Sequence, residues 1–279
     1  MLRNKIGAGM VALAGWVVSA GAAMAVPKPW EMNFQPAVTP VMTDIHDFHR
    51  LLVYIITAIC LFVLALLLWI MVRYNTRANP TPSKTSHNTL LEVAWTIVPV
   101  IILVFIAIPS FRLLYFEGTI PHPDLTIEAI GKQWYWTYVY PDDGNFQFDS
   151  LMLDDADAAK AHEPRLLGVD NPIYVPVNKV VEIETTGADV IHSWAVPAFG
   201  VKMDAVPGRI NHTWFKATKQ GTYYGECSEL CGARHAFMPI EVKVVSEAEF
   251  QAWQAAAKKK FAGNAIPANP NTRLAALQK

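Results

Sequence analysis

Charge of either sign is scarce in this chain, and cysteine is scarcer still. Of the 279 residues, 17% are charged and the formal net charge at pH 7 is −1. No basic surplus points to nucleic acid, so no nucleic-acid partner is expected. The three cysteines form no C-x-x-C-H motif, which excludes a covalently attached c-type haem.

What the sequence has in excess is apolar residues, which make up 52% of the chain. Two runs, 51–72 and 93–111, contain no charged residue. About 20 apolar residues cross the hydrocarbon core of a bilayer as a helix, so 48–116 is predicted to be a transmembrane helical hairpin. The alternative, two buried helices of a soluble core, is disfavoured because the two runs lie so close together.

The first 25 residues resemble a secretory signal peptide. Basic Arg3 and Lys5 precede an apolar run over 6–20, and the small residues Ala23 and Ala25 suit a signal peptidase. We predict a signal peptide over 1–25 that is cleaved after Ala25. An uncleaved first membrane anchor is the alternative.

Positive charge predicts the orientation of the hairpin. The connection between the apolar runs carries Arg73, Arg77 and Lys84 and no acid, so we expect it in the cytoplasm. The N-terminus and everything after about residue 117 then lie outside. In a bacterium, this is the periplasmic side of the inner (plasma) membrane.

The rest of the chain divides into a lead-in and an exported domain. Prolines punctuate an extended lead-in over 26–47, whereas 117–245 contains short β-rich runs between Pro, Gly, Asn and Asp clusters. The expected strands include 125–130, 134–140, 180–185 and 240–244. Many short strands without helical periodicity predict a β-sandwich or a Greek-key barrel.

The last segment, 246–279, begins with a helix signal. Ser246 and Glu249 have the spacing of a capping box, which predicts a helix to about Lys259. The residues after this helix are rich in Pro, Ala and Asn and are predicted to form a disordered tail.

The most informative motif is C-x3-C-x3-H-x2-M. It consists of Cys227, Cys231, His235 and Met238, and His192 precedes it on an earlier strand or loop. Thiolate, imidazole and thioether ligands together favour copper. One Cys, two His and one Met would describe a mononuclear blue-copper site, whereas a second thiolate allows two sulfurs to bridge two copper ions.

Two other readings of this motif remain open at this point. Paired cysteines in an exported domain are more often a disulfide, although His and Met at loop spacing reverse that preference. Zinc is the alternative metal, but methionine is a poor zinc ligand. Cys60, in the first predicted membrane helix, is expected only to pack against lipid or protein.

Several motifs together resemble subunit II of the cytochrome c oxidase family within the haem–copper oxidases. The resemblance covers about residues 40–245, and apart from the copper loop it is carried by E-V-A-W-T-I-V-P at 92–99, Q-W-Y-W at 133–136, H-S-W-A-V-P at 192–197 and P-G-R at 207–209. It implies a two-helix transmembrane hairpin followed by an all-β, cupredoxin-like Greek-key domain. This domain would carry CuA, a binuclear copper centre with two copper ions per chain.

The resemblance also implies a role for each residue of the copper loop. Cys227 and Cys231 would bridge the two coppers, His192 and His235 would each bind one, and Met238 and the Glu229 carbonyl would be weak axial ligands. The Glu229 carboxylate would bind a magnesium or manganese ion shared with subunit I. From the residues alone, a solvated loop acid is the simpler reading of Glu229.

Five further residues receive roles from the resemblance. Trp134 would admit the electron beneath a docked cytochrome c, although alternating strand positions also explain this aromatic run. Asp189, and more weakly Asp142 and Asp143, would attract the basic rim of cytochrome c. Glu92 would take up protons, although an acid at a helix N-terminus is also favoured by the helix dipole.

The predicted function is the electron-accepting subunit of a proton-pumping oxidase. Electrons would pass from cytochrome c through CuA to haem a in subunit I, which also holds haem a3 and CuB, and subunit III is a further expected partner. A quinol oxidase subunit II, which lacks the copper ligands, is one alternative. A nitrous oxide reductase and a copper storage or delivery protein are others.

Overall fold

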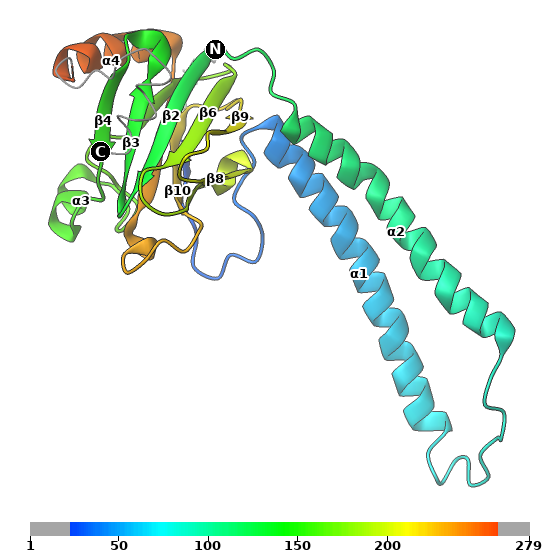
Figure 1. Ribbon diagram of the computed structural model, residues 1–279. Coiled ribbons are helices and arrows are strands. Elements are labelled where there is room, and N and C mark those ends of the chain that lie inside the picture. The colour runs from blue at the N-terminus through cyan, green and yellow to red at the C-terminus, as the bar shows by residue number, and fades with distance from the viewer. Residues whose placement is uncertain (1–22, 262–279) are drawn as a thin grey trace, which may run out of the picture.

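The structure, a computed structural model, describes residues 23–261, and in it a long helical hairpin projects from a β domain (Figure 1). The helices are α1 (Pro40–Arg73), α2 (Thr89–Gly118), α3 (Asp155–Ala161) and α4 (Glu247–Lys260). The strands are β1 (Ala23–Ala25), β2 (Leu125–Lys132), β3 (Tyr135–Tyr140), β4 (Phe146–Ser150), β5 (Ile173–Pro176), β6 (Val181–Gly187), β7 (His192–Val196), β8 (Val201–Ala205), β9 (Asn211–Phe215), β10 (Gly221–Cys227) and β11 (Pro239–Val245). The predicted fold, a two-helix hairpin followed by an all-β cupredoxin-like domain, is confirmed.

Helix α1 begins at Pro40, within the segment 26–47 that was expected to be an extended lead-in. The Thr39 hydroxyl caps the helix by accepting a hydrogen bond from the Met42 N–H at 3.0 Å, and Pro40 occupies the first turn. Proline is tolerated there because the first helical N–H groups have no partner within the helix. The last proline of the segment 26–47 therefore starts a helix, whereas the sequence predicted an extended chain there.

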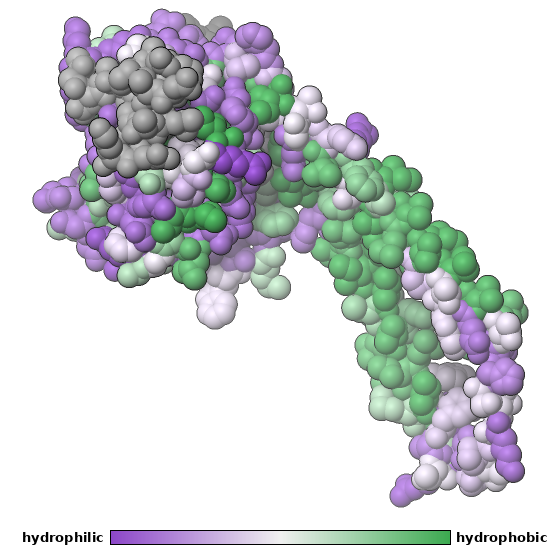
Figure 2. Space-filling view, viewed as in Figure 1, coloured by the Kyte–Doolittle hydropathy of each residue, from purple (hydrophilic) through white to green (hydrophobic). Residues whose placement is uncertain are grey.

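Both helices of the hairpin are long and apolar enough to cross a membrane. Their apolar side chains are exposed and form a continuous hydrophobic column in Figure 2. Helix α2 starts at the Asn88 cap, whose side chain accepts from the Leu91 N–H at 3.1 Å, and it contains Pro99 and Pro109. Among the described residues of α2, none is buried, as expected for a helix whose surroundings lie outside this chain.

Two sheets form the β domain. One has the order β5-β11-β10-β7-β8, with β1 also paired to β10, and the other has the order β4-β3-β2-β6-β9. Aromatic rings fill the space between them, and the fully buried ones include Trp136, Trp194, Tyr138, Tyr140, Tyr223 and Phe215. This aromatic core fixes the strands that carry the copper motif.

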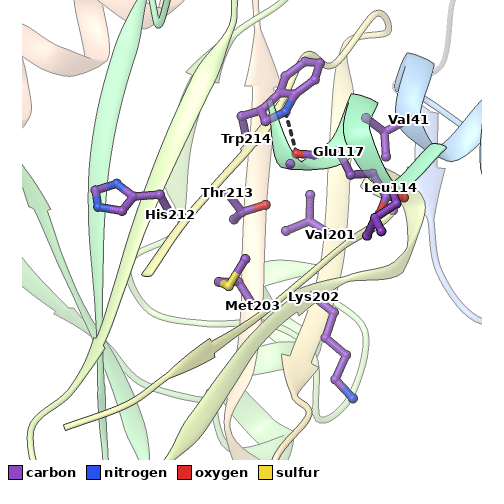
Figure 3. A pocket seen from close by; sticks show the side chains of 11 residues that line it. Val41, Leu114, Glu117, Val201, Lys202, Met203, His212, Thr213 and Trp214 are labelled. Carbon is purple, nitrogen blue, oxygen red and sulfur yellow. Dashed lines mark hydrogen bonds between the residues drawn. The ribbon is translucent and has the colours of Figure 1, made fainter. Parts of the chain in front are cut away.

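A small contact region joins the hairpin to the β domain. The Trp214 indole N–H on β9 donates to the Glu117 carbonyl near the end of α2 at 3.1 Å, and the Trp214 ring meets Phe116 edge-on. A cavity of about 230 Å³ lies beside this contact and is lined by both apolar and polar residues of α1, α2, β8 and β9, among them Val41, Glu117 and His212 (Figure 3).

Most elements predicted for the exported domain are present. Strands β2, β3, β6 and β11 overlap the predicted runs, and α4 begins with the expected capping box of Ser246 and Glu249. Helix α3 was not predicted because its seven residues are too few to show helical periodicity. Most of the predicted signal peptide and all of the tail after residue 261 lie outside the described residues, and the end of the predicted signal forms β1.

Candidate metal centre

The copper motif lies at one end of the sandwich, where β10 leads into a loop that returns through a short 3-10 turn, His235–Phe237, to β11. The loop is fixed at both ends. The Cys227 N–H donates to the Met238 carbonyl at 3.1 Å, and the Ser228 N–H donates to the Ser193 carbonyl at 3.0 Å. These bonds place the loop beside His192, the first residue of β7.

The side-chain donors of the loop converge on one small volume. The sulfurs of Cys227 and Cys231 lie 3.8 Å apart. His192 Nδ1 lies 3.9 Å from Cys227 Sγ, and His235 Nδ1 lies 3.7 Å from Cys231 Sγ. The carbonyl oxygen of Glu229 lies 3.4 Å from Cys227 Sγ, and Met238 is buried next to them.

Cys227 and Cys231 do not form the disulfide that the sequence left open as an alternative. A disulfide holds its sulfurs about 2.05 Å apart, whereas Cys227 and Cys231 are free cysteines. Two thiolates flanked symmetrically by two imidazoles suit a pair of soft metal ions better than one. The donor set therefore fits binuclear copper, with Cys227, Cys231, His192 and His235 as the residues that would hold it.

The two thiols differ in acidity. Burial disfavours ionisation of Cys227, but hydrogen bonds with His192 and with neighbouring backbone groups outweigh it and lower the pKa of Cys227 to about 6. Burial and the negative charge of the Cys227 thiolate raise the pKa of Cys231 to about 12. Without a cation the pair shares one proton near neutral pH, which metal binding would release.

Trp134 lies directly against the metal loop. Its half-buried indole donates through Nε1 to the Cys231 carbonyl at 3.2 Å, and the Gln133 side chain donates to the same oxygen through Nε2 at 2.8 Å. Gly232, at φ +118°, lies so close that a Cβ would stand 3.1 Å from the Trp134 ring. Sequence reasoning missed Gln133 and Gly232, although Gln133 stands inside the quoted Q-W-Y-W motif.

Asp189 contacts His192 directly. Its carboxylate accepts from His192 Nε2 at 2.8 Å, from the Gln133 N–H at 2.7 Å and from the Val190 N–H at 2.7 Å. Partial burial opposes ionisation, but these hydrogen bonds outweigh it and lower the pKa of Asp189. Burial likewise opposes protonation of His192, but the contacts with Cys227 and Asp189 raise its pKa.

Gly131 on β2 is a third residue that sequence reasoning missed. A Cβ at this position would lie 2.6–2.8 Å from three carbon atoms of the His192 side chain, closer than real contacts allow. The parallel pairing of β2 with β6, the strand that precedes the His192 strand, brings this glycine to the metal centre. No sequence motif signals it.

Asp142 and Asp143, the weaker of the predicted docking acids, lie away from the metal loop. They follow β3 at the end opposite to Trp134, and six strand residues span about 20 Å. The Asp142 carboxylate accepts from the Thr126 N–H at 3.0 Å, and Asp143 pairs with Lys258 of α4 at 3.3 Å. Their carboxylates have local structural partners.

The two remaining predicted residues are Glu229, which is exposed, and Glu92, which is partly buried. Glu229 lies on the metal loop, where its carboxylate faces solvent in this chain. Glu92 lies in the first turn of α2, at the far end of the hairpin from the β domain, and lines a shallow pocket with Thr89 and Thr96. The structure does not bring Glu92 near the metal loop.

Comparison with known proteins agrees with both parts of the fold. The family model described as "Cytochrome C oxidase subunit II, periplasmic domain" matches residues 125–245, and the model described as "Cytochrome C oxidase subunit II, transmembrane domain" matches residues 27–113. The match to the transmembrane model, together with the two spanning-length helices, identifies a membrane protein.

Individual relatives match nearly the whole chain. The "Probable cytochrome c oxidase subunit 2" of Rickettsia bellii is 52% identical over 250 residues, covering 90% of this chain and 91% of that protein. Cytochrome c oxidase subunit 2 of Cereibacter sphaeroides is 43% identical over 263 residues, covering 88% and 86%. A crystal structure of the periplasmic domain of subunit II of cytochrome oxidase from Bradyrhizobium japonicum is 62% identical, covers 51% of this chain and 99% of that chain, and has a TM-score of 0.48. From the extent and identity of the sequence matches, the chain belongs to the cytochrome c oxidase subunit II family.

Proposed function

We propose that this chain accepts electrons from cytochrome c at a binuclear CuA centre and passes them to haem a in subunit I, where oxygen is reduced to water and protons are pumped. The observation that carries the proposal is the convergence of the Cys227 and Cys231 sulfurs with the His192 and His235 imidazoles. When bound there, two copper ions would supply a one-electron carrier whose charge is spread over both metals.

The protein's part is to hold the donors still. Cys227 is at the end of β10 and His192 at the start of β7, and these two strands pair through Cys227 and Trp194. Met238 immediately precedes β11, which pairs with the other edge of β10. A donor set anchored on paired strands moves little when charge changes, which is the condition for fast electron transfer.

We propose Trp134 as the residue through which electrons arrive. Its indole is partly exposed on one side and hydrogen-bonded on the other to the backbone of Cys231. This gives a short connection from the surface to a copper thiolate. Asp189, with an exposed edge beside Trp134, remains the acid that could meet the basic rim of cytochrome c.

Partners follow from the family and remain part of the proposal. Subunit I would carry haem a, haem a3 and CuB, subunit III would complete the core, and the exposed Glu229 carboxylate would contribute to a magnesium or manganese ion shared with subunit I. The β domain would face the periplasm of a bacterial inner membrane. The Glu92 carboxylate would admit protons from the cytoplasmic side.

The test is to purify the oxidase with this chain unchanged and with Cys227→Ser. The unchanged complex is expected to oxidise reduced cytochrome c. The Cys227→Ser complex is expected to contain two copper ions fewer. A complex that oxidises quinol instead of cytochrome c, or whose copper content Cys227→Ser leaves unchanged, would contradict the proposal. Gly118→Ala is a matched control, because a Cβ at Gly118 has no atom within 4 Å.

A further inference from the structure

Asp189 occupies the position where three segments of the metal centre meet. It lies on the connection between β6 and β7, beside the turn that carries Trp134 and beside the imidazole of His192. The His192 side chain is completely buried, whereas the Asp189 side chain is 34% exposed. The carboxylate thus reaches inward to a buried metal-site histidine.

The contact with His192 decides which ring nitrogen faces the metal. Nδ1 points toward Cys227 Sγ, and Nε2 points toward Asp189 Oδ1 at 2.8 Å. A carboxylate can only accept, so Nε2 carries a proton, and in the neutral imidazole Nδ1 keeps its lone pair for a metal. Histidines that bind metals generally donate their other N–H to such an acceptor, which fixes both the tautomer and the ring orientation.

The other oxygen of Asp189 holds the Trp134 turn. Oδ2 accepts from the backbone N–H of Gln133, the residue before Trp134, at 2.7 Å. The side chain of Gln133 in turn donates to the carbonyl of Cys231. One carboxylate therefore ties the strand of the electron-admitting tryptophan to a copper-binding histidine.

We infer that Asp189 is a positioning residue that orients His192 toward the metal and fixes the Trp134 turn to it, independently of any role in docking cytochrome c. The inference rests on the proposed function, because it concerns a copper site. A docking acid acts by its charge, whereas a positioning acid acts by its acceptor oxygens. Substitutions that separate charge from acceptor therefore distinguish the two roles.

The experiment uses the full-length chain in detergent, loaded with copper, and compares Asp189→Asn, Asp189→Ala and Asp189→Leu. Asn loses the charge but keeps an acceptor oxygen, whereas Ala and Leu lose both, and Leu keeps the approximate volume. Asp142→Ala is the control, because it removes an equal charge from the far end of β3. The readouts are the copper EPR spectrum and the chelator concentration that removes half of the copper.

We expect Asp189→Ala and Asp189→Leu to release copper at a chelator concentration lower by about 10-fold or more, with altered hyperfine structure. Asp189→Asn and Asp142→Ala should remain close to the unmodified chain. Normal behaviour of Asn, Ala and Leu alike would overturn the inference, and equal impairment of all three would overturn it in favour of a charge effect. Failure of the proposed function would be seen separately, as an unmodified chain that does not hold two coppers.

Discussion

At Gly131 the metal centre has no room for a side chain. In Gly131→Ala the new methyl group would meet the His192 ring at 2.6–2.8 Å, so the imidazole must turn away from Cys227. We expect retention of the fold by circular dichroism together with a loss of copper of about 10-fold in chelator competition. Gly118→Ala is the control. Normal copper retention in Gly131→Ala would contradict this account, because it would mean that the His192 ring tolerates a methyl group at position 131.

Trp134 should matter for the arrival of electrons more than for the binding of metal. In Trp134→Ala the Cys231 carbonyl keeps its bond from Gln133, so copper content should stay at the level of the unmodified chain. Reduction of the copper centre by cytochrome c in stopped-flow experiments should slow by at least about 10-fold. The control is Trp30→Ala, which removes a tryptophan that is 97% exposed. Equal reduction rates in the unmodified chain and Trp134→Ala would remove the assignment.

At this scale the sequence predicts which side chains of the loop come together, but not which residues surround them. Cys227, Cys231, His235 and Met238 are close in the chain, so their spacing alone shows that they can meet. Asp189 was predicted, but only as a docking acid, and its contact with His192 depends on the local path of the chain before β7. Contacts made across strands have no spacing signature.

At the scale of elements, the buried Glu241 side chain of β11 connects the segment 151–172 to that strand. Glu241, which is 1% exposed, accepts from the Val169 N–H at 3.0 Å and pairs with Lys243, which also reaches Glu163. Burial outweighs the attraction of Lys243 and raises the pKa of Glu241.

This raised pKa predicts a pH dependence of stability. From pH 4.5 up to the raised pKa of Glu241, the folded state binds more protons than the unfolded state, so its stability falls as pH rises and then levels off. In Glu241→Gln this contribution is absent. We expect the difference in melting temperature, unmodified minus variant, to become smaller or more negative between pH 4.5 and 7. A difference that grows with pH would show that the ion pair with Lys243 outweighs burial.

The elements also show where sequence reasoning fails. The alternation of 125–130 and 240–244 predicts strands because each has one face in the aromatic core. Helix α3 was not predicted because its seven residues complete only two turns. Helix α1 starts before the predicted residue 48 because Pro40 is suited to the first turn of a helix. The helix cap at Ser246 was predicted from its spacing to Glu249, whereas the cap at Thr39 was not recognised before the proline that follows it.

At the scale of the whole molecule, the hairpin places Glu92 and the metal centre at opposite ends (Figure 1). Protons and electrons would therefore enter from opposite sides of the membrane. In Glu92→Gln we expect normal reduction of haem a by cytochrome c but steady-state turnover slower by about 10-fold, because only proton uptake is impaired. The flash-induced and steady-state rates of the purified oxidase give both quantities. Full turnover in Glu92→Gln would leave the acid as a helix-terminal charge.

The most direct measurement is the EPR spectrum and copper content of the full-length chain after loading with copper. The account predicts two copper ions per chain and one unpaired electron shared by two equivalent copper nuclei, because two thiolates with matching histidines form a nearly symmetric site. A single copper with the hyperfine pattern of one nucleus, or a copper-free chain with Cys227 and Cys231 joined in a disulfide, would contradict it.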